Sequence, residues 1–86
     1  MPEICRFFGI VIKMFFDDHA PPHFHVEYDE YRAVIDIRSL ATIGGHLPPR
    51  AAGMVVEWAA RRAEELLELW ETAAAKQPLR RLPPLE

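Results

Sequence analysis

The stretch FHVEYDEYRAVIDI, residues 24–37, decides the fold, because it has the pattern of two β-strands joined by a two-residue turn at Asp29-Glu30. In that arrangement one face of the hairpin carries only apolar and aromatic side chains. The opposed residues on this face are Tyr28 with Tyr31, Val26 with Ala33, and Phe24 with Ile35, and on the other face Glu27 with Arg32, His25 with Val34, and His23 with Asp36. The stretch therefore predicts an antiparallel hairpin with one buried face.

The segments around this hairpin extend the sheet. Residues 4–16, ICRFFGIVIKMFF, are rich in Ile, Val and Phe and predict one or two further strands, with Gly9 as a bulge or bend. Residues 17–22, DDHAPP, form a loop, because two successive prolines interrupt strand pairing. Residues 39–43 are a candidate for another short strand. Residues 1–46 are therefore expected to form an antiparallel sheet of three or four strands.

The second half of the chain has helical periodicity. Residues 48–75 carry a broad apolar stripe opposite a face rich in glutamate, and Pro49 suits the first helical position. We expect one long helix packed on one face of the sheet. Residues 76–86, KQPLRRLPPLE, contain three prolines and are expected to lie extended, on the domain itself or on a partner. The whole chain, residues 1–86, is thus predicted to be one α+β domain.

The composition is that of one small globular domain. The chain has 86 residues, of which 50% are hydrophobic, and a formal net charge of -3. Its single cysteine, Cys5, excludes an intrachain disulfide and a zinc ribbon. No apolar run approaches the roughly 20 residues that cross a bilayer. We therefore expect a soluble cytoplasmic protein without membrane contact. The negative charge disfavours direct nucleic-acid binding, and a homo-oligomer is compatible with the sequence.

Three of the four histidines fall within HAPPHFHVEY, residues 19–28. His23 and His25 are two apart on a predicted strand and project from one face, with His19 in the preceding loop and Asp36 opposite His23. Two imidazoles and a carboxylate can bind a transition metal, and Asp36 would be a ligand or the acceptor that orients an imidazole. The same residues could support acid–base hydrolysis. Alternatively, they are polar residues of a solvated strand face, and no cofactor is firmly assigned.

A second group of residues suggests contacts with a partner protein. Trp58, Arg62 and Leu69 fall on the shoulder of the predicted helix, between the apolar stripe and the charged face. A tryptophan in this position is commonly the edge of a core, but an aromatic residue beside arginine is also typical of an interface anchor. Together with Arg80 and Arg81 of the tail, these three residues are the candidate partner-binding residues.

Four segments in order, PEICRFFGIVIKMFF, DDHAPPHFHVEY, LPPRAAGMVVEWA and PLRRLPPL, make the chain resemble a family of small bacterial proteins known as domain of unknown function 4160. The resemblance implies a stand-alone protein that pairs with another small protein, encoded by a neighbouring gene, as a toxin–antitoxin component. It implies no catalytic residues. We therefore predict a non-enzymatic protein-interaction module. The alternative is a histidine-based metal-binding or hydrolytic protein, whose target could be RNA.

Overall fold

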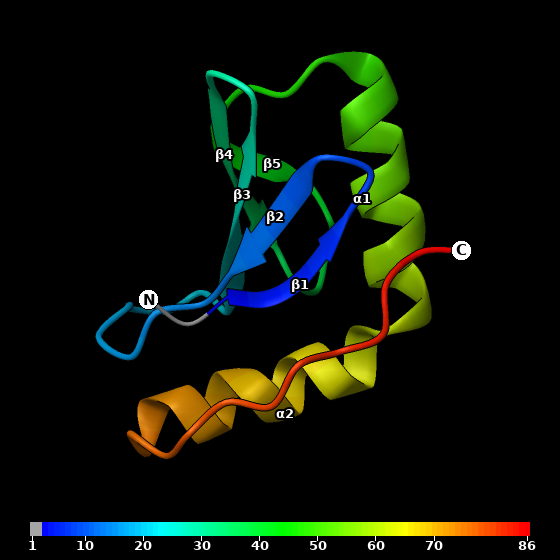
Figure 1. Ribbon diagram of the computed structural model, residues 1–86. Helices are drawn as coiled ribbons and strands as arrows, with labels where there is room; N and C mark the ends of the chain where they lie inside the picture. Colours follow the sequence, from blue (N-terminus) through cyan, green and yellow to red (C-terminus); the bar gives the residue numbers. More distant parts are fainter. Residues whose placement is uncertain (1–2) are drawn as a thin grey trace.

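An antiparallel sheet of five strands, arranged in their order along the chain, forms the framework of the computed structural model, which describes residues 3–86 (Figure 1). Two helices follow the strands. The elements are β1 (Glu3–Phe7), β2 (Ile10–Lys13), β3 (His23–Tyr28), β4 (Tyr31–Asp36), β5 (Thr42–Gly45), α1 (Pro49–Arg61) and α2 (Ala63–Ala74). The α+β class predicted from the sequence is confirmed, but the sheet has five strands instead of three or four.

The central hairpin of β3 and β4 has the predicted register. All six predicted pairs are present. Asp29 opens the turn with a φ of 52°, a backbone conformation that aspartate tolerates better than most residues. Phe24 and Val26 are buried together with their partners Ile35 and Ala33. The alternation of side chains along β3 therefore turns the histidines toward the face opposite the core.

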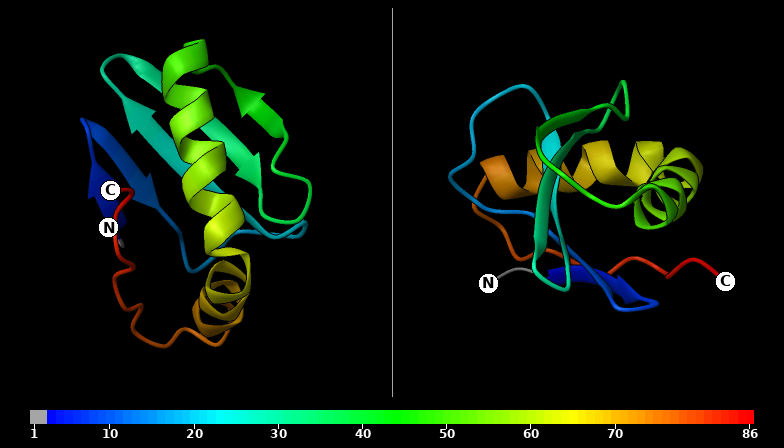
Figure 2. Two further views of the ribbon diagram at one scale, coloured as in Figure 1. Left: turned by 90° about the vertical axis from the view of Figure 1, so that its right-hand side faces the viewer. Right: turned by 90° about the horizontal axis from the view of Figure 1, so that it is seen from above.

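The predicted single helix over residues 48–75 is two helices. α1 ends at Arg61 and α2 begins at Ala63, because Arg62 leaves the helical conformation with a φ of -124° and a ψ of 24°. Figure 2 shows α1 across one face of the sheet and α2 turning away beyond the sheet's end. A straight helix over residues 48–75 would be about 42 Å long, whereas the longest dimension of the domain is 33 Å. Neither helix of the described chain is long and apolar enough to cross a membrane.

The break at Arg62 changes which side chains of the helices are buried. Trp58 is 1% exposed and Leu69 is 2% exposed, so the prediction that they contact a partner at the surface is wrong. The Trp58 ring lies near Phe7 and Phe24, with ring centroids 5.7 and 6.0 Å away. Its Nε1 donates a hydrogen bond of 2.8 Å to the carbonyl oxygen of Pro83. The tail therefore covers the side of α1 that carries Trp58, which the helical pattern had placed between the apolar stripe and the charged face.

The C-terminal tail lies on its own domain, which is one of its two predicted placements. Leu82 is buried, and its N–H donates to the carbonyl oxygen of Ile4 at 2.8 Å, so the tail runs along the outer edge of β1 (Figure 2). The two tail arginines are exposed but pair within the chain. Arg80 reaches two glutamates of α2, Glu65 and Glu68, at 3.6 and 3.5 Å, and Arg81 reaches Glu3 at 2.8 Å. Arg62 likewise pairs with Glu65, at 3.1 Å.

The ion pairs of Glu3 predict a loss of stability in acid. Hydrogen bonds from Arg6 and Arg81 hold the pKa of Glu3 at about 2, below its ordinary 4.5. A lowered pKa in the folded state means that the carboxylate stabilises the fold at neutral pH, and this contribution is lost as the pH falls from about 4.5 through about 2. We expect the wild type to have a higher urea midpoint than Glu3→Gln at pH 7 and a much smaller difference near pH 2, where about half of the Glu3 carboxyls are protonated in the folded state. A difference near pH 2 as large as that at pH 7 would contradict this charge effect.

Gly45 and Gly44 of β5 form a matched pair for testing the sheet's edge. Gly45 has a φ of 71°, and a Cβ at this position would overlap the backbone carbonyl of Arg32 on β4. A Cβ on Gly44 would lie 3.5 Å from the Val34 side chain, an ordinary contact. We expect Gly45→Ala to lower the free energy of unfolding by about 2 kcal/mol or more, and Gly44→Ala to change it little. Urea denaturation of both variants measures the difference, and equal losses would contradict the clash.

Candidate functional site

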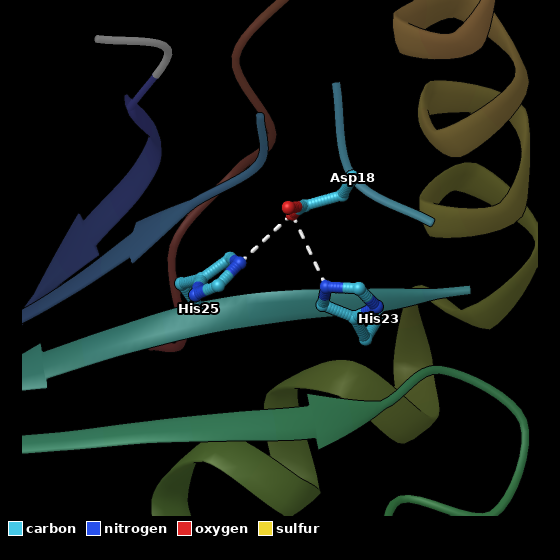
Figure 3. A group of neighbouring side chains, drawn as sticks. All are labelled: Asp18, His23 and His25. Atoms are coloured by element: carbon cyan, nitrogen blue, oxygen red, sulfur yellow. Dashed lines mark hydrogen bonds and ion pairs between the residues drawn. The ribbon is translucent and has the colours of Figure 1, made fainter. Parts of the chain in front are cut away.

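The side chains of Asp18, His23 and His25 converge on one point above β3 (Figure 3). Oδ2 of Asp18 lies 2.8 Å from Nε2 of His25 and 3.1 Å from Nε2 of His23. Each residue offers one nitrogen or oxygen atom, and these atoms all lie within 4.8 Å of one another. Within residues 3–86, no fourth His, Cys, Asp or Glu belongs to this group. The three residues therefore form a compact set of two imidazoles and one carboxylate.

Strand geometry and loop geometry together position these residues. His23 and His25 are two apart on β3, so their side chains leave the same face of the sheet. Asp18 belongs to the loop of residues 14–22, which connects β2 to β3 and returns over that face. The neighbouring Asp17 is held by an ion pair of 2.5 Å with Lys76, just beyond α2. This pair of exposed side chains brings the loop close to the chain just after α2.

The hydrogen bonds of His23 determine which of its ring nitrogens can bind a ligand. Nδ1 lies 2.7 Å from the carbonyl oxygen of Pro21, and a carbonyl only accepts, so Nδ1 carries a hydrogen. In the neutral ring Nε2 then holds a lone pair, which faces the Asp18 carboxylate, another acceptor. Two facing acceptors need a proton or a metal ion between them. A backbone carbonyl on the remote nitrogen is also the usual partner of a metal-ligating histidine.

Packing holds both rings in place. His23 is only 9% exposed, and its ring centroid lies 5.1 Å from that of Trp70 on α2. The His25 ring makes an edge contact with Phe15, at 4.6 Å between centroids. Since aromatic neighbours restrict both imidazoles, little side-chain freedom remains to be lost when they bind a ligand.

Asp36, the carboxylate predicted from the sequence, is not part of this group. It lies opposite His23 in the register, as expected, but its Oδ1 accepts hydrogen bonds of 2.8 Å from the backbone N–H groups of Arg38 and Ser39. These bonds, that of Ser39 first, lower the pKa of Asp36 below its ordinary 3.8. Asp36 therefore closes the turn after β4, a usual role for aspartate at such a position.

The other predicted member, His19, also lies outside the group. It is exposed in the loop, and Asp18, its neighbour, supplies the third side chain instead. The fourth histidine, His46, lies beside Tyr31, with ring centroids 5.9 Å apart. The sequence signal that could have identified Asp18 is the loop itself, since DDHAPPH places two carboxylates before a rigid return into β3.

Comparison with known protein families agrees with the resemblance noted in the sequence. The family model described as Domain of unknown function (DUF4160) matches residues 9–71. The chain belongs to this family. The part of the chain that matches the DUF4160 model contains Asp18, His23 and His25 and ends before the tail of residues 76–86. Among curated proteins and among solved structures, no protein matches the chain.

The arrangement in this DUF4160 protein suits a metal ion chemically. Zinc–nitrogen distances of about 2.0–2.1 Å place tetrahedral ligand atoms roughly 3.4 Å from one another. The observed separations of 2.8 and 3.1 Å between Asp18 and the two imidazoles are slightly shorter, so small shifts of the loop would admit an ion. Three protein ligands also leave at least one coordination position open, as in catalytic metal sites.

Proposed function

We propose that this protein binds one divalent transition-metal ion through Asp18, His23 and His25. The observation that carries the proposal is the convergence of Nε2 of His23, with its Nδ1 tied to Pro21, on the Asp18 carboxylate and the second imidazole. Imidazole and carboxylate ligands suit zinc, cobalt, nickel and iron. Two neutral imidazoles and one carboxylate leave a divalent ion with a net positive charge, which favours Lewis-acid chemistry at an open position.

Metal uptake tests this proposal directly. Equilibrium dialysis of the protein against Co²⁺ or Zn²⁺, followed by metal analysis, should find about one ion per chain. His23→Ala combined with His25→Ala should abolish the uptake. His46→Gln and His19→Gln remove imidazoles outside the group and should leave the stoichiometry unchanged.

The double variant requires a check of its fold, because His23 is nearly buried. Circular dichroism should show secondary structure similar to that of the wild type, and His25→Ala alone provides a milder test at a half-buried position. Wild-type stoichiometry near zero under metal-replete conditions would contradict the proposal, as would undiminished uptake by a folded double variant. If the protein hydrolyses an ester or RNA at this site, we expect that activity to depend on the bound metal ion.

A second candidate function, protein interaction as a toxin–antitoxin component, is favoured by a different surface. Phe8 is 64% exposed and has a φ of 49°, an unusual conformation for an aromatic residue. It lines a groove of about 300 Å³ together with Tyr28, Arg50 and Met54. Exposed aromatic residues beside an arginine are typical of interface anchors. We propose this groove as the contact surface for a small protein encoded by a neighbouring gene.

Co-expression with the product of the neighbouring gene tests the second candidate. The two chains should co-purify, and Phe8→Asn should weaken the complex by about tenfold or more, as expected for the loss of an aromatic anchor. Asparagine tolerates positive φ, so this variant should fold at least as stably as the wild type. Phe16→Asn, which removes another exposed aromatic outside the groove, is the matched control. An unchanged complex with Phe8→Asn would contradict this surface assignment.

A further inference from the structure

We infer that the groove beside His25, on the open face of the sheet, binds a small organic anion whose oxygen atoms coordinate the metal while its apolar, ring-sized body lies in the groove. The inference rests on the proposed metal binding and adds a ligand class to the same site. The groove is lined by Phe15, His25, Glu27, Arg32, Val34 and Gly44. His25 belongs both to this lining and to the metal-binding group, so the two sites share a side chain.

The apolar part of the groove follows from the pairing of three strands. His25 on β3 lies opposite Val34 on β4, and Val34 lies opposite Gly44 on β5. Because Gly44 has no side chain, a hollow remains beside the Val34 side chain. The Phe15 ring makes an edge contact with the His25 ring. The groove has a volume of about 240 Å³. A cavity of about 150 Å³ can hold benzene, so the groove is large enough for one ring.

The charges around the groove favour an anion. Glu27 lies between two cations, 2.8 Å from Nζ of Lys13 and 3.7 Å from Nε of Arg32. At neutral pH the two cations and the one carboxylate of this group sum to one positive charge. The bound metal with its three ligands adds another positive charge. An anionic ligand would therefore meet favourable potential at the metal and along the rim of the groove.

Two hydroxamates that differ only in their apolar group test this inference on the Co²⁺-loaded protein. Acetohydroxamate and benzohydroxamate offer the metal the same oxygen atoms, whereas only the second has a ring for the groove. Titration followed by the visible spectrum of cobalt should give a dissociation constant about tenfold lower for benzohydroxamate, equivalent to 1.4 kcal/mol. Gly44→Val should remove this preference, since its side chain would occupy the hollow next to Val34.

Matched variants keep the test interpretable. Ile43→Val alters an exposed neighbour on the same strand that does not line the groove, and it should retain the tenfold preference. If Gly44→Val does not fold, Val34→Thr, which makes the floor polar at nearly constant volume, should reduce the preference instead. Equal affinity of the two hydroxamates for the wild type, or no binding of either by the cobalt protein, would overturn the inference and leave metal binding intact. Absence of cobalt uptake would overturn both.

Discussion

Replacing Trp58 with alanine is expected to lower the free energy of unfolding by about 4 kcal/mol. The side chain is 1% exposed and packs near Phe7 of β1 and Phe24 of β3, so its removal leaves a large cavity between the sheet and α1. A domain of this length has a total stability of roughly 4–13 kcal/mol. The loss is therefore between roughly a third and all of this stability, so the variant should unfold at a clearly lower urea concentration than the wild type, as measured by circular dichroism.

Trp58→Phe separates the volume of the side chain from its hydrogen bond. Phenylalanine keeps an aromatic ring in the cavity but cannot donate to the Pro83 carbonyl, which accepts from Nε1 at 2.8 Å. We expect a loss of about 1–2 kcal/mol from the missing bond and the smaller ring. If Trp58→Ala were instead as stable as the wild type and lost only a binding partner, the residue would be the exposed anchor that the helix pattern allowed.

The hairpin of β3 and β4 could be predicted because its information is local. Five of the six consecutive pairs across the turn agree in polarity, the exception being His25 with Val34, and a shift by one residue would place every apolar side chain on the opposite face. The break between α1 and α2 has no such signal. Arg62 is neither proline nor glycine. A straight helix of about 42 Å would exceed the 33 Å longest dimension of the folded domain, and the periodicity of the sequence does not report that dimension.

The candidate site shows the same division between local and tertiary information. The spacing of His23 and His25 correctly placed both imidazoles on one face of a strand. The register also placed Asp36 opposite His23, but a turn immediately after β4 draws its carboxylate to the backbone. Asp18 comes from the loop of residues 14–22, which returns over β3 from a neighbouring part of the chain. Strand register alone therefore could not identify Asp18 as the carboxylate that lies beside the two histidines.

Zinc at a thousandfold excess over its dissociation constant is expected to raise the free energy of unfolding by about 4 kcal/mol. The folded state holds Asp18 of the loop close to His23 and His25 of β3, whereas the unfolded chain does not keep them together. Urea denaturation with and without Zn²⁺ measures this gain. Asp18→Asn, which replaces the carboxylate ligand with a neutral amide, should reduce the gain by about 3 kcal/mol, corresponding to a loss of affinity of roughly 100-fold or more.

Asp36→Asn is the matched control, because it makes the same chemical change in the carboxylate that the sequence alone favoured. The asparagine side chain keeps Oδ1, which accepts the backbone N–H groups of Arg38 and Ser39, so the turn should persist. Zinc should then stabilise Asp36→Asn as much as the wild type. The opposite result, with the gain kept by Asp18→Asn and lost by Asp36→Asn, would assign the metal to the cross-strand pair of His23 and Asp36.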